Sequence, residues 1–378
     1  MKVGFVSETL TSTFLPTAMV RANYITAVAS RVDSFWLPDH LNSLLPRSLG
    51  TPGYVGVTRY FPRIEAYLEP WTLLGRVAGW NQVPKLRLGV GVTDSGRRNP
   101  AVTAQAAATL HLMTRGRAIL GMGTGERVGN EQYGVEWSKP VGRFEEAVAT
   151  IRALWNSGGE LVSRDSPYFR LRNAVFDIPP YAGTWPEIWI AAHGPRMLRI
   201  TGRYADAWFP GLPQSPAEYA QKLDLVRSAA SDAGRDPMTV TPTVWLFVIT
   251  AKNDDQVAVA LSSNMMKVFA LQFPAALWKR YGRTHPLGEN FSGAQDLVPQ
   301  SIDARTALEY ASQVPDTMVS DWLVTGTPEK ALEQLAVWRD HGVRYVVLCN
   351  ISFLQPSLRN GLASGRAFAE IARRARRL

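Results

Sequence analysis

Two short runs in the chain place ionisable side chains directly after strand-like sequence. The run Ser34-Phe-Trp-Leu-Pro leads to Asp39 and His40, and the run that begins at Ala118 ends at Glu126. An imidazole transfers protons well near neutral pH, and a carboxylate can exchange a proton or stabilise a developing cation. Polar chemistry at the carboxyl ends of hydrophobic strands is typical of parallel α/β-barrel enzymes. We therefore predict an enzyme, although a surface Asp-His pair and an ordinary loop carboxylate are the alternatives for each site alone.

Three further loops carry groups that suit a cofactor. The turn Gly121-Met-Gly-Thr-Gly125 lacks a Gly-Lys-Ser/Thr ending and no helix follows at once, which argues against a P-loop or a Rossmann turn. Its glycines could instead let a flat cofactor approach the backbone. The turn at 191–197 opens a predicted helix, where backbone N–H groups can hold phosphate. The loop at 93–100 offers hydroxyls, an acid and two arginines. The alternatives are a plain turn for 191–197 and a polar helix-capping loop for 93–100.

The composition excludes several other functions. The net charge is +9, but the basic residues are dispersed except for the Arg-rich end at 373–377, so we do not expect nucleic-acid binding. That tail is a solvated helix end or, alternatively, a weak contact with an anionic membrane surface. No histidine lies at metal-ligand spacing, and we predict no metal. The single cysteine, Cys349, lies in an apolar run and is predicted to be an inert core thiol.

The location expected from these features is cytoplasmic, with attachment to the inner membrane as an open alternative. One cysteine fits a reducing compartment, and no run of 18 apolar residues suggests a membrane-spanning helix. The strand-like start at 1–6 leaves no room for a signal peptide.

Strand-like and helix-like runs alternate along the chain, which predicts parallel βα units. The eight candidate strands are Val3–Val6, Ser34–Leu37, Leu86–Thr93, Ala118–Gly123, Glu187–Ala192, Ala207–Pro210, Val240–Ile249 and Tyr345–Asn350. The candidate helices are Pro100–Thr114, Arg143–Trp155, Gly194–Tyr204, Pro216–Gly234 and Pro328–Gly342. Eight strands with interleaved helices favour a (β/α)8 TIM barrel over a doubly wound sheet. We expect one domain, 1–378.

Four stretches do not fit the βα rhythm, and we expect them to be insertions. They span about 41–68, 127–142, 156–186 and 251–325. The third holds Tyr168–Leu171 and Ala174–Ile178, which suggest a hairpin. Long insertions in barrels are usually lids or substrate walls.

The motifs together resemble the luciferase-like flavin and deazaflavin barrel family, in the branch that uses coenzyme F420. The residues that carry this resemblance are Asp39-His40, Thr93–Gln105, Gly116–Glu126 and Ala191–Pro195. Further matches resemble the mycobacterial lipid ketoreductases of that branch nearly end to end. They are Asp39–Asn42, Pro46–Ser48, Glu69–Thr72, Gly96–Pro100, Tyr133–Trp137 and Gly293–Asp296.

The resemblance implies an F420-dependent ketoreductase that transfers hydride from reduced F420 to a lipid ketone in cell-wall lipid biosynthesis. It implies that His40 handles the substrate proton and that Glu126 is its partner acid. The residues that would bind the cofactor are Asp39, Thr93, Thr124, Gly125 and Asn130, with His193, Gly194, Arg196 and Met197 holding phosphate through backbone groups. Asn130 lies one residue later than its counterpart in sugar-phosphate dehydrogenases. A homodimer is expected by analogy with relatives.

Two departures from sugar-phosphate relatives concern the substrate. Those relatives have a Trp four residues after the catalytic His, where this chain has Leu44, and the segment 211–216 lacks their phosphate-gripping lysine. Both changes favour an apolar, long-chain ketone. Apolar side chains in 251–325 would form a greasy tunnel or, alternatively, simple core; they are Phe269, Leu271, Phe273, Leu277 and Trp278. The rival functions are an F420-dependent dehydrogenase of another alcohol or sugar, an FMN-dependent luciferase-like monooxygenase, and a binding barrel without turnover.

Overall fold

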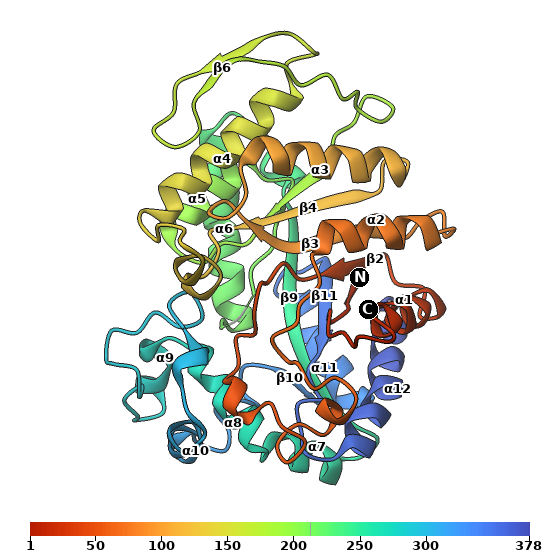
Figure 1. The fold of residues 1–378 in the computed structure, drawn as a ribbon, viewed down its shortest axis with the longest axis vertical. Coiled ribbons are helices and arrows are strands. Elements are labelled where there is room, and N and C mark those ends of the chain that lie inside the picture. Colours follow the sequence, from red (N-terminus) through yellow and green to blue (C-terminus); the bar gives the residue numbers. More distant parts are fainter. Residues whose placement is uncertain (212) are drawn as a thin grey trace.

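The computed structural model describes residues 1–211 and 213–378, and its centre is a closed barrel of eight parallel strands (Figure 1). The barrel strands are β1 (Lys2–Val6), β2 (Ser34–Leu37), β3 (Arg87–Asp94), β4 (Ala118–Gly123), β7 (Glu187–Ile190), β8 (Ala207–Trp208), β9 (Thr241–Thr250) and β11 (Tyr345–Asn350). They are the eight strands predicted from the sequence, with bounds that differ by at most two residues. The predicted (β/α)8 barrel is therefore confirmed.

Neighbouring barrel strands follow the chain order, and the pairing of the last strand with the first closes the ring. Strand β11 pairs with β1, and β9 pairs with both β8 and β11. The short β10 (Val324–Gly326) adds to the far end of β9. Because all these strands are parallel, their carboxyl ends, and the loops that follow them, meet at one mouth of the barrel.

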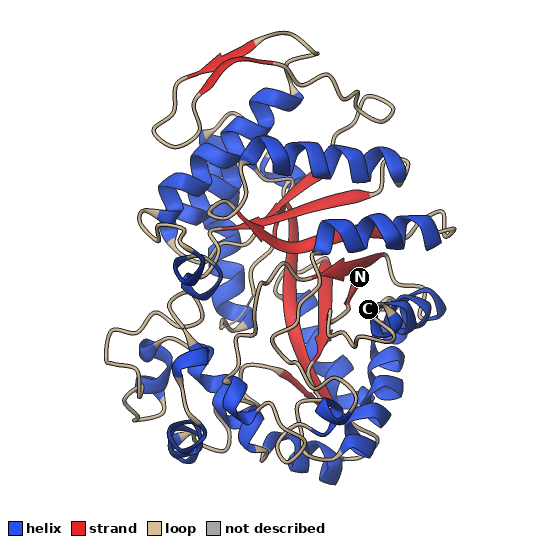
Figure 2. Ribbon diagram, viewed as in Figure 1, coloured by secondary structure: helices blue, strands red, loops and turns tan. Residues whose placement is uncertain are grey.

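Helices cover the outside of the strands (Figure 2). Those that follow the strands are α1 (Ala18–Ala29), α2 (Pro70–Trp80), α3 (Pro100–Met113), α4 (Pro140–Trp155), α5 (Pro195–Tyr204), α6 (Pro216–Asp232), α11 (Pro328–Asp340) and α12 (Leu358–Ala375). The five predicted helices are confirmed with small shifts at their ends. Helices α1, α2 and α12 were not among them. None of the helices in the described residues is long and apolar enough to cross a membrane.

The insertions contain their own secondary structure. Segment 251–325 contains four short helices joined by loops, α7 (Asp254–Leu261), α8 (Asn264–Phe269), α9 (Ala275–Arg280) and α10 (Ala304–Gln313). The hairpin predicted within 156–186 exists, but its strands were placed wrongly. Strand β5 (Val162–Arg164) pairs antiparallel with β6 (Leu171–Ala174), whereas the prediction paired 168–171 with 174–178. The apolar residues at 168–171 led to the wrong strand assignment. A short hairpin at the surface buries few side chains, so the hydrophobic pattern does not fix its register.

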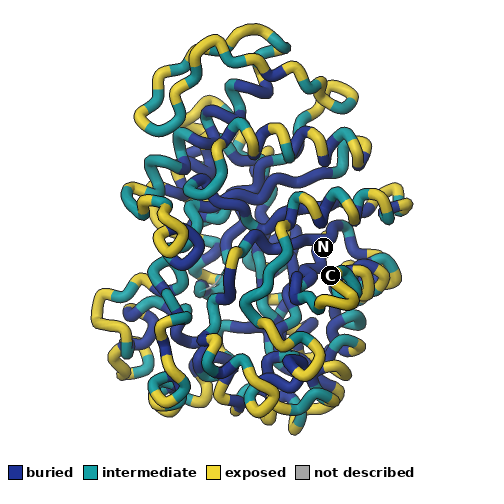
Figure 3. Tube along the Cα trace, viewed as in Figure 1, coloured by how far each residue is buried: buried dark blue, intermediate teal, exposed yellow. Residues whose placement is uncertain are grey.

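The interior of the barrel is filled with aromatic side chains. Trp36 packs against Trp189 and Phe209 with ring centroids 5.0 Å apart, and Trp189 packs against Tyr345 at the same distance. These rings, like the strands that carry them, are buried (Figure 3). Gly89 on β3 makes room for them, since a Cβ there would lie 2.5 Å from Cε3 of Trp36. The space for chemistry is therefore at the mouth, not through the barrel axis.

Candidate active site

The predicted site residues lie on loops that follow neighbouring strands. Strands β2, β3, β4 and β7 are consecutive in the sheet, and they are followed by the loops at 38–40, 94–99, 124–130 and 191–195. The amide of Ala191 donates to the Met122 carbonyl, which joins the last two of these loops. The parallel register thus brings the four predicted constellations to one rim.

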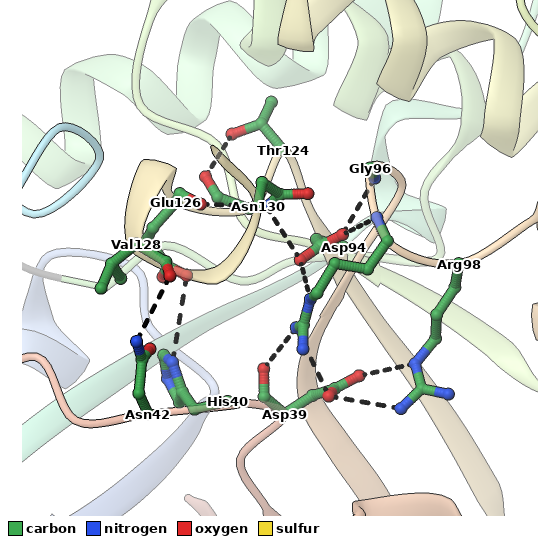
Figure 4. A network of polar contacts seen from close by, with 12 residues as sticks. Asp39, His40, Asn42, Asp94, Gly96, Arg98, Thr124, Glu126, Val128 and Asn130 are labelled. Carbon is green, nitrogen blue, oxygen red and sulfur yellow. Dashed lines mark hydrogen bonds and ion pairs between the residues drawn. The ribbon is translucent and has the colours of Figure 1, made fainter. Parts of the chain in front are cut away.

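His40 and Glu126 face each other across that rim (Figure 4). The His40 Nδ1 atom lies 4.0 Å from Oε2 of Glu126, within ion-pair range when the imidazole is protonated. Both side chains are about one-quarter exposed, so they can reach solvent or a ligand. The edge of the Tyr67 ring packs against His40 with the ring centroids 5.8 Å apart. The structure therefore brings together the two residues predicted to be catalytic.

A buried carboxylate, Asp94, organises the loops on either side of this pair. It accepts hydrogen bonds from the Gly96 and Arg97 amides, from Arg97 Nε at 2.6 Å and from Asn130 Nδ2 at 3.3 Å. Asn130 also donates to the Glu126 carbonyl at 2.9 Å. The Asn130 amide nitrogen thus fixes the turn that presents Glu126. Whether its buried Oδ1 atom, which has no partner among the described residues, binds a cofactor stays a prediction.

Asp39 is held by arginines rather than by the neighbouring histidine. Arg98 Nε donates to its carboxylate at 3.1 Å, and Arg97 Nη2 donates to its backbone carbonyl at 2.7 Å. Burial disfavours the charged guanidinium of Arg97, but Asp94 and Asp39 outweigh this and raise its pKa. These contacts fix the segment that carries His40. Both arginines were predicted to lie in the polar loop, but their contacts with Asp39 were not predicted. Ion pairs between distant loops leave no local signal in the sequence.

Three features near β3 and β4 fit a flat cofactor. Thr93 is fully buried, and its hydroxyl has no partner among the described residues, so it can receive one from a ligand. Gly125 has φ +81°, and a Cβ there would lie 2.7 Å from Cβ of Asp94. Thr124 is partly exposed beside it, with only a long contact to the Gly125 carbonyl. The turn thus needs glycine at this position.

The turn at 193–197 fits phosphate through its backbone only. Gly194 is the N-cap of α5 and no side chain caps that helix, which leaves its first N–H groups without intrahelical partners. The Arg196 guanidinium pairs with Glu145 on α4 at 3.0 Å, and the Met197 side chain is buried in the core. His193 is exposed. The predicted role of this turn remains a prediction.

A largely apolar cavity of about 130 Å³ opens beside His40. Its wall combines the 41–68 insertion, the ends of β9 and β11 and helix α8; it includes Leu44, Leu45, Val55, Trp245, Phe247, Met265, Phe269 and Leu354. Leu44, which replaces the Trp of sugar-phosphate relatives, lies in this wall. Of the five apolar residues suggested as a tunnel in 251–325, only Phe269 lines the cavity. The other four are buried core, so the tunnel interpretation is wrong for them. Leu212, in the segment compared with the lysine-bearing loop, lies outside the described residues.

Glu8, two residues beyond β1, is a residue of this cavity that the sequence analysis missed. Its carboxylate accepts a hydrogen bond from the Cys349 thiol at 3.3 Å and shares the wall with His40 and Tyr67. Burial raises the pKa of Glu8, although the Cys349 thiol and His40 oppose the shift. Burial also raises the pKa of Cys349. Cys349 is thus a buried thiol, as predicted, but it faces the cavity. The feature of the sequence that could have identified Glu8 as a site residue is its position as a charged residue just after the first strand.

The chain matches the profile of the luciferase-like monooxygenase family over residues 29–345. It therefore belongs to the luciferase-like family. It is 61% identical, over 95% of its length and 94% of the relative's, to the phthiodiolone/phenolphthiodiolone dimycocerosates ketoreductase of Mycobacterium sp. (strain JLS). It is 55% identical to the ketoreductase of the same name from Mycobacterium tuberculosis (strain ATCC 25618 / H37Rv), over all of its length and 99% of the relative's.

Solved structures share the fold at low sequence identity. An F420-dependent secondary alcohol dehydrogenase, solved with an F420-acetone adduct, superposes with a TM-score of 0.72 at 18% identity, covering 98% of each chain. The oxygenating constituent of 3,6-diketocamphane monooxygenase from Pseudomonas putida, solved with FMN, gives 0.66 at 15% identity, covering 98% of this chain and 96% of the other. These likenesses establish the fold, which both types of cofactor use.

Proposed function

We propose that this protein is an F420-dependent ketoreductase that reduces a long-chain lipid ketone, of the phthiodiolone or phenolphthiodiolone dimycocerosate type, to the secondary alcohol. The observation that carries the proposal is the His40–Glu126 pair at the edge of an apolar cavity. The name of the relatives at 53–61% identity supports a ketoreductase with this substrate class. The apolar residue Leu44 beside His40 supports a lipid over a sugar phosphate.

Some residues of the site would transfer a proton, and others would orient the residue that does so. Reduced F420, when bound, supplies a hydride for the carbonyl carbon. His40 gives its proton to the carbonyl oxygen as that oxygen becomes an alkoxide, and Glu126 stabilises the protonated imidazole beforehand. The Arg97 and Arg98 contacts to Asp39 hold His40 in place. A fixed acid in a water-poor cavity contributes through proximity and through stronger electrostatic interactions.

The rim residues support a bound deazaflavin or flavin. Thr93, Thr124 and Gly125 would lie along the ring, Asp39 would contribute from the neighbouring loop, and the 193–197 turn would hold a phosphate. An FMN-dependent monooxygenase is the second candidate, because the diketocamphane enzyme binds FMN on the same fold. The match of 93–105 and 116–126 to the F420 branch favours F420. A homodimer stays a prediction.

Titration of the purified protein with F420 and, separately, with FMN tests the cofactor choice. We expect F420 to bind at micromolar concentration, followed by its fluorescence, with no detectable FMN binding. Preference for FMN together with oxygen consumption would replace the ketoreductase by the monooxygenase.

A further inference from the structure

Two neighbouring loops form an exposed apolar patch on the mouth side of the barrel. Phe14 is 93% exposed, Leu15 is 65% exposed, and Tyr60 is 63% exposed. Together with Arg59 and Arg63 they form what we call the mouth patch. A shallow hollow between the loops is lined by residues 11–14, Pro16, 59–60, 62–63 and Ala66. Large aromatic and aliphatic side chains in full contact with water indicate an interaction surface.

The two segments that carry the mouth patch contain basic but no acidic side chains. Residues 9–32 and 41–64 contain five arginines and no Asp or Glu, whereas the whole chain has 32 acidic residues. Arg59 and Arg63 are exposed, and within the described residues neither forms an ion pair. Exposed apolar rings flanked by free guanidinium groups are the combination that binds a bilayer surface with anionic headgroups.

The mouth patch is continuous with the substrate cavity. Leu10 pairs with Tyr67 through an antiparallel bridge, which joins the loop after β1 to the 41–68 insertion. Both residues and Ile64 line the cavity beside His40. In Figure 1 the orange loops of the 41–68 insertion lie in front of β9, β10 and β11, in the lower half of the view. The patch is therefore the outer face of the same two loops whose inner face forms the cavity wall.

We propose that the mouth patch docks the protein on an anionic lipid bilayer and presents the cavity to lipid substrate there. The docking proposal rests on the proposed function only in that a lipid substrate gives membrane docking a role. The observations that support docking do not depend on that function. Phe14, Leu15 and Tyr60 enter the interfacial region, and Arg59 and Arg63 bind headgroup phosphates. The Arg-rich tail is a weaker candidate for this contact. Arg374 pairs with Glu329 and Glu370, and Arg376 lies 3.5 Å from Asp33, so acids neutralise part of its charge.

Cosedimentation with vesicles tests the docking without cofactor or substrate. The full-length protein is mixed with vesicles of phosphatidylcholine alone or with one-third phosphatidylglycerol. We expect binding to the anionic vesicles that weakens in high salt. Phe14→Ser with Leu15→Ser, and separately Arg59→Gln with Arg63→Gln, should each lower the partition coefficient at least ten-fold. Each arginine near an anionic surface contributes on the order of a five-fold change.

Two matched variants serve as controls. Leu161→Ser removes a side chain that is also 65% exposed, on the far hairpin loop, and Arg373→Gln with Arg377→Gln removes two charges from the tail. Both should bind vesicles like the unaltered protein. Equal losses in the controls, or no binding of the unaltered protein, would overturn the docking proposal. A change of oligomeric state in the patch variants would assign the surface to a second copy instead. F420 binding is measured in parallel on every variant and should not change, so failure of docking and failure of the proposed function are distinguishable.

Discussion

His40 is the residue on which the proposed chemistry depends most directly. It follows β2, it lines the cavity, and Glu126 lies 4.0 Å from its ring. The variant His40→Asn keeps a polar side chain but cannot supply the proton. We expect F420 affinity to stay unchanged and kcat to fall about 10²–10⁴-fold, the usual contribution of a positioned acid or base. Steady-state turnover and F420 fluorescence check this, and an unchanged kcat would remove His40 from the mechanism.

Glu8 should make substrate binding depend on pH. Because burial raises its pKa above the ordinary value of 4.5, the carboxyl stays neutral to higher pH than an exposed glutamate. Ionisation above that raised pKa places a charge in an apolar cavity, which disfavours a lipid chain. KM for a long-chain ketone should therefore rise with pH in the unaltered protein and stay flat in Glu8→Gln. If the variant keeps the same pH dependence, another group is responsible.

The site was predictable from sequence to the extent that its residues share local motifs. Asp39-His40 and the Gly-Thr-Gly-Glu turn each follow a strand, so the parallel barrel brings them to one rim without further information. The partners of these residues were not predictable in the same way. Glu8 and Tyr67 join the cavity through contacts between distant loops, which strand and helix periodicity does not encode.

At the scale of elements, buried charge fixes the loop after β3, through Asp94 and Arg97, and joins it to the loop after β2, through Arg97 and Asp39. Asp94 and Arg97 are largely buried and lie 2.6 Å apart, so water cannot take the place of either group when the other is removed. Asp94→Asn leaves the Arg97 guanidinium without its main partner. We expect a loss of about 3–5 kcal/mol in the free energy of unfolding. Asp165→Asn, which breaks an exposed pair with Arg172, should cost at most about 1 kcal/mol. Urea unfolding compares the two, and similar losses would contradict the buried network.

The turn between β4 and Glu126 requires glycine at position 125 for two reasons, a positive φ and the lack of space for a Cβ, and the two can be tested separately. Gly125 and Gly134 both have positive φ, +81° and +77°, but only at Gly125 would a Cβ meet another residue, Asp94. Gly134→Ala should cost about 1–2 kcal/mol from backbone strain alone. Gly125→Ala should cost more and should also weaken F420 binding. Thermal unfolding with cofactor titration tests this, and equal effects of the two substitutions would show that the clash is unimportant.

The barrel was predictable because its eight strands are short apolar runs separated by polar loops and helical patterns. The elements that escaped prediction had weaker or unused signals. Helix α1 has neither an acidic first turn nor a side-chain cap. Helix α2 does begin with a recognisable signal, Glu69 followed by Pro70, where the Glu69 carboxylate caps the first turn. The β5–β6 register failed because neither strand contains a buried residue, so burial does not select a register.

At the scale of the whole molecule, the filled barrel and the long insertions contribute different parts of the site. Aromatic side chains close the barrel interior, and the cavity is built at the mouth from the 41–68 insertion and α8. The same 41–68 insertion carries three of the five residues of the mouth patch, Arg59, Tyr60 and Arg63, on its outer face. A change in that insertion would therefore alter the substrate wall and the proposed membrane contact together, while the rim that would hold the cofactor belongs to the barrel itself.

The most direct measurement is anaerobic oxidation of reduced F420 by the purified protein in the presence of a phthiodiolone-type ketone, followed by F420 absorbance and by analysis of the lipid product. We predict F420 oxidation that matches the secondary alcohol formed, one for one, and that disappears in His40→Asn. Absence of ketone reduction with bound F420, or product formation only with FMN and oxygen, would contradict it.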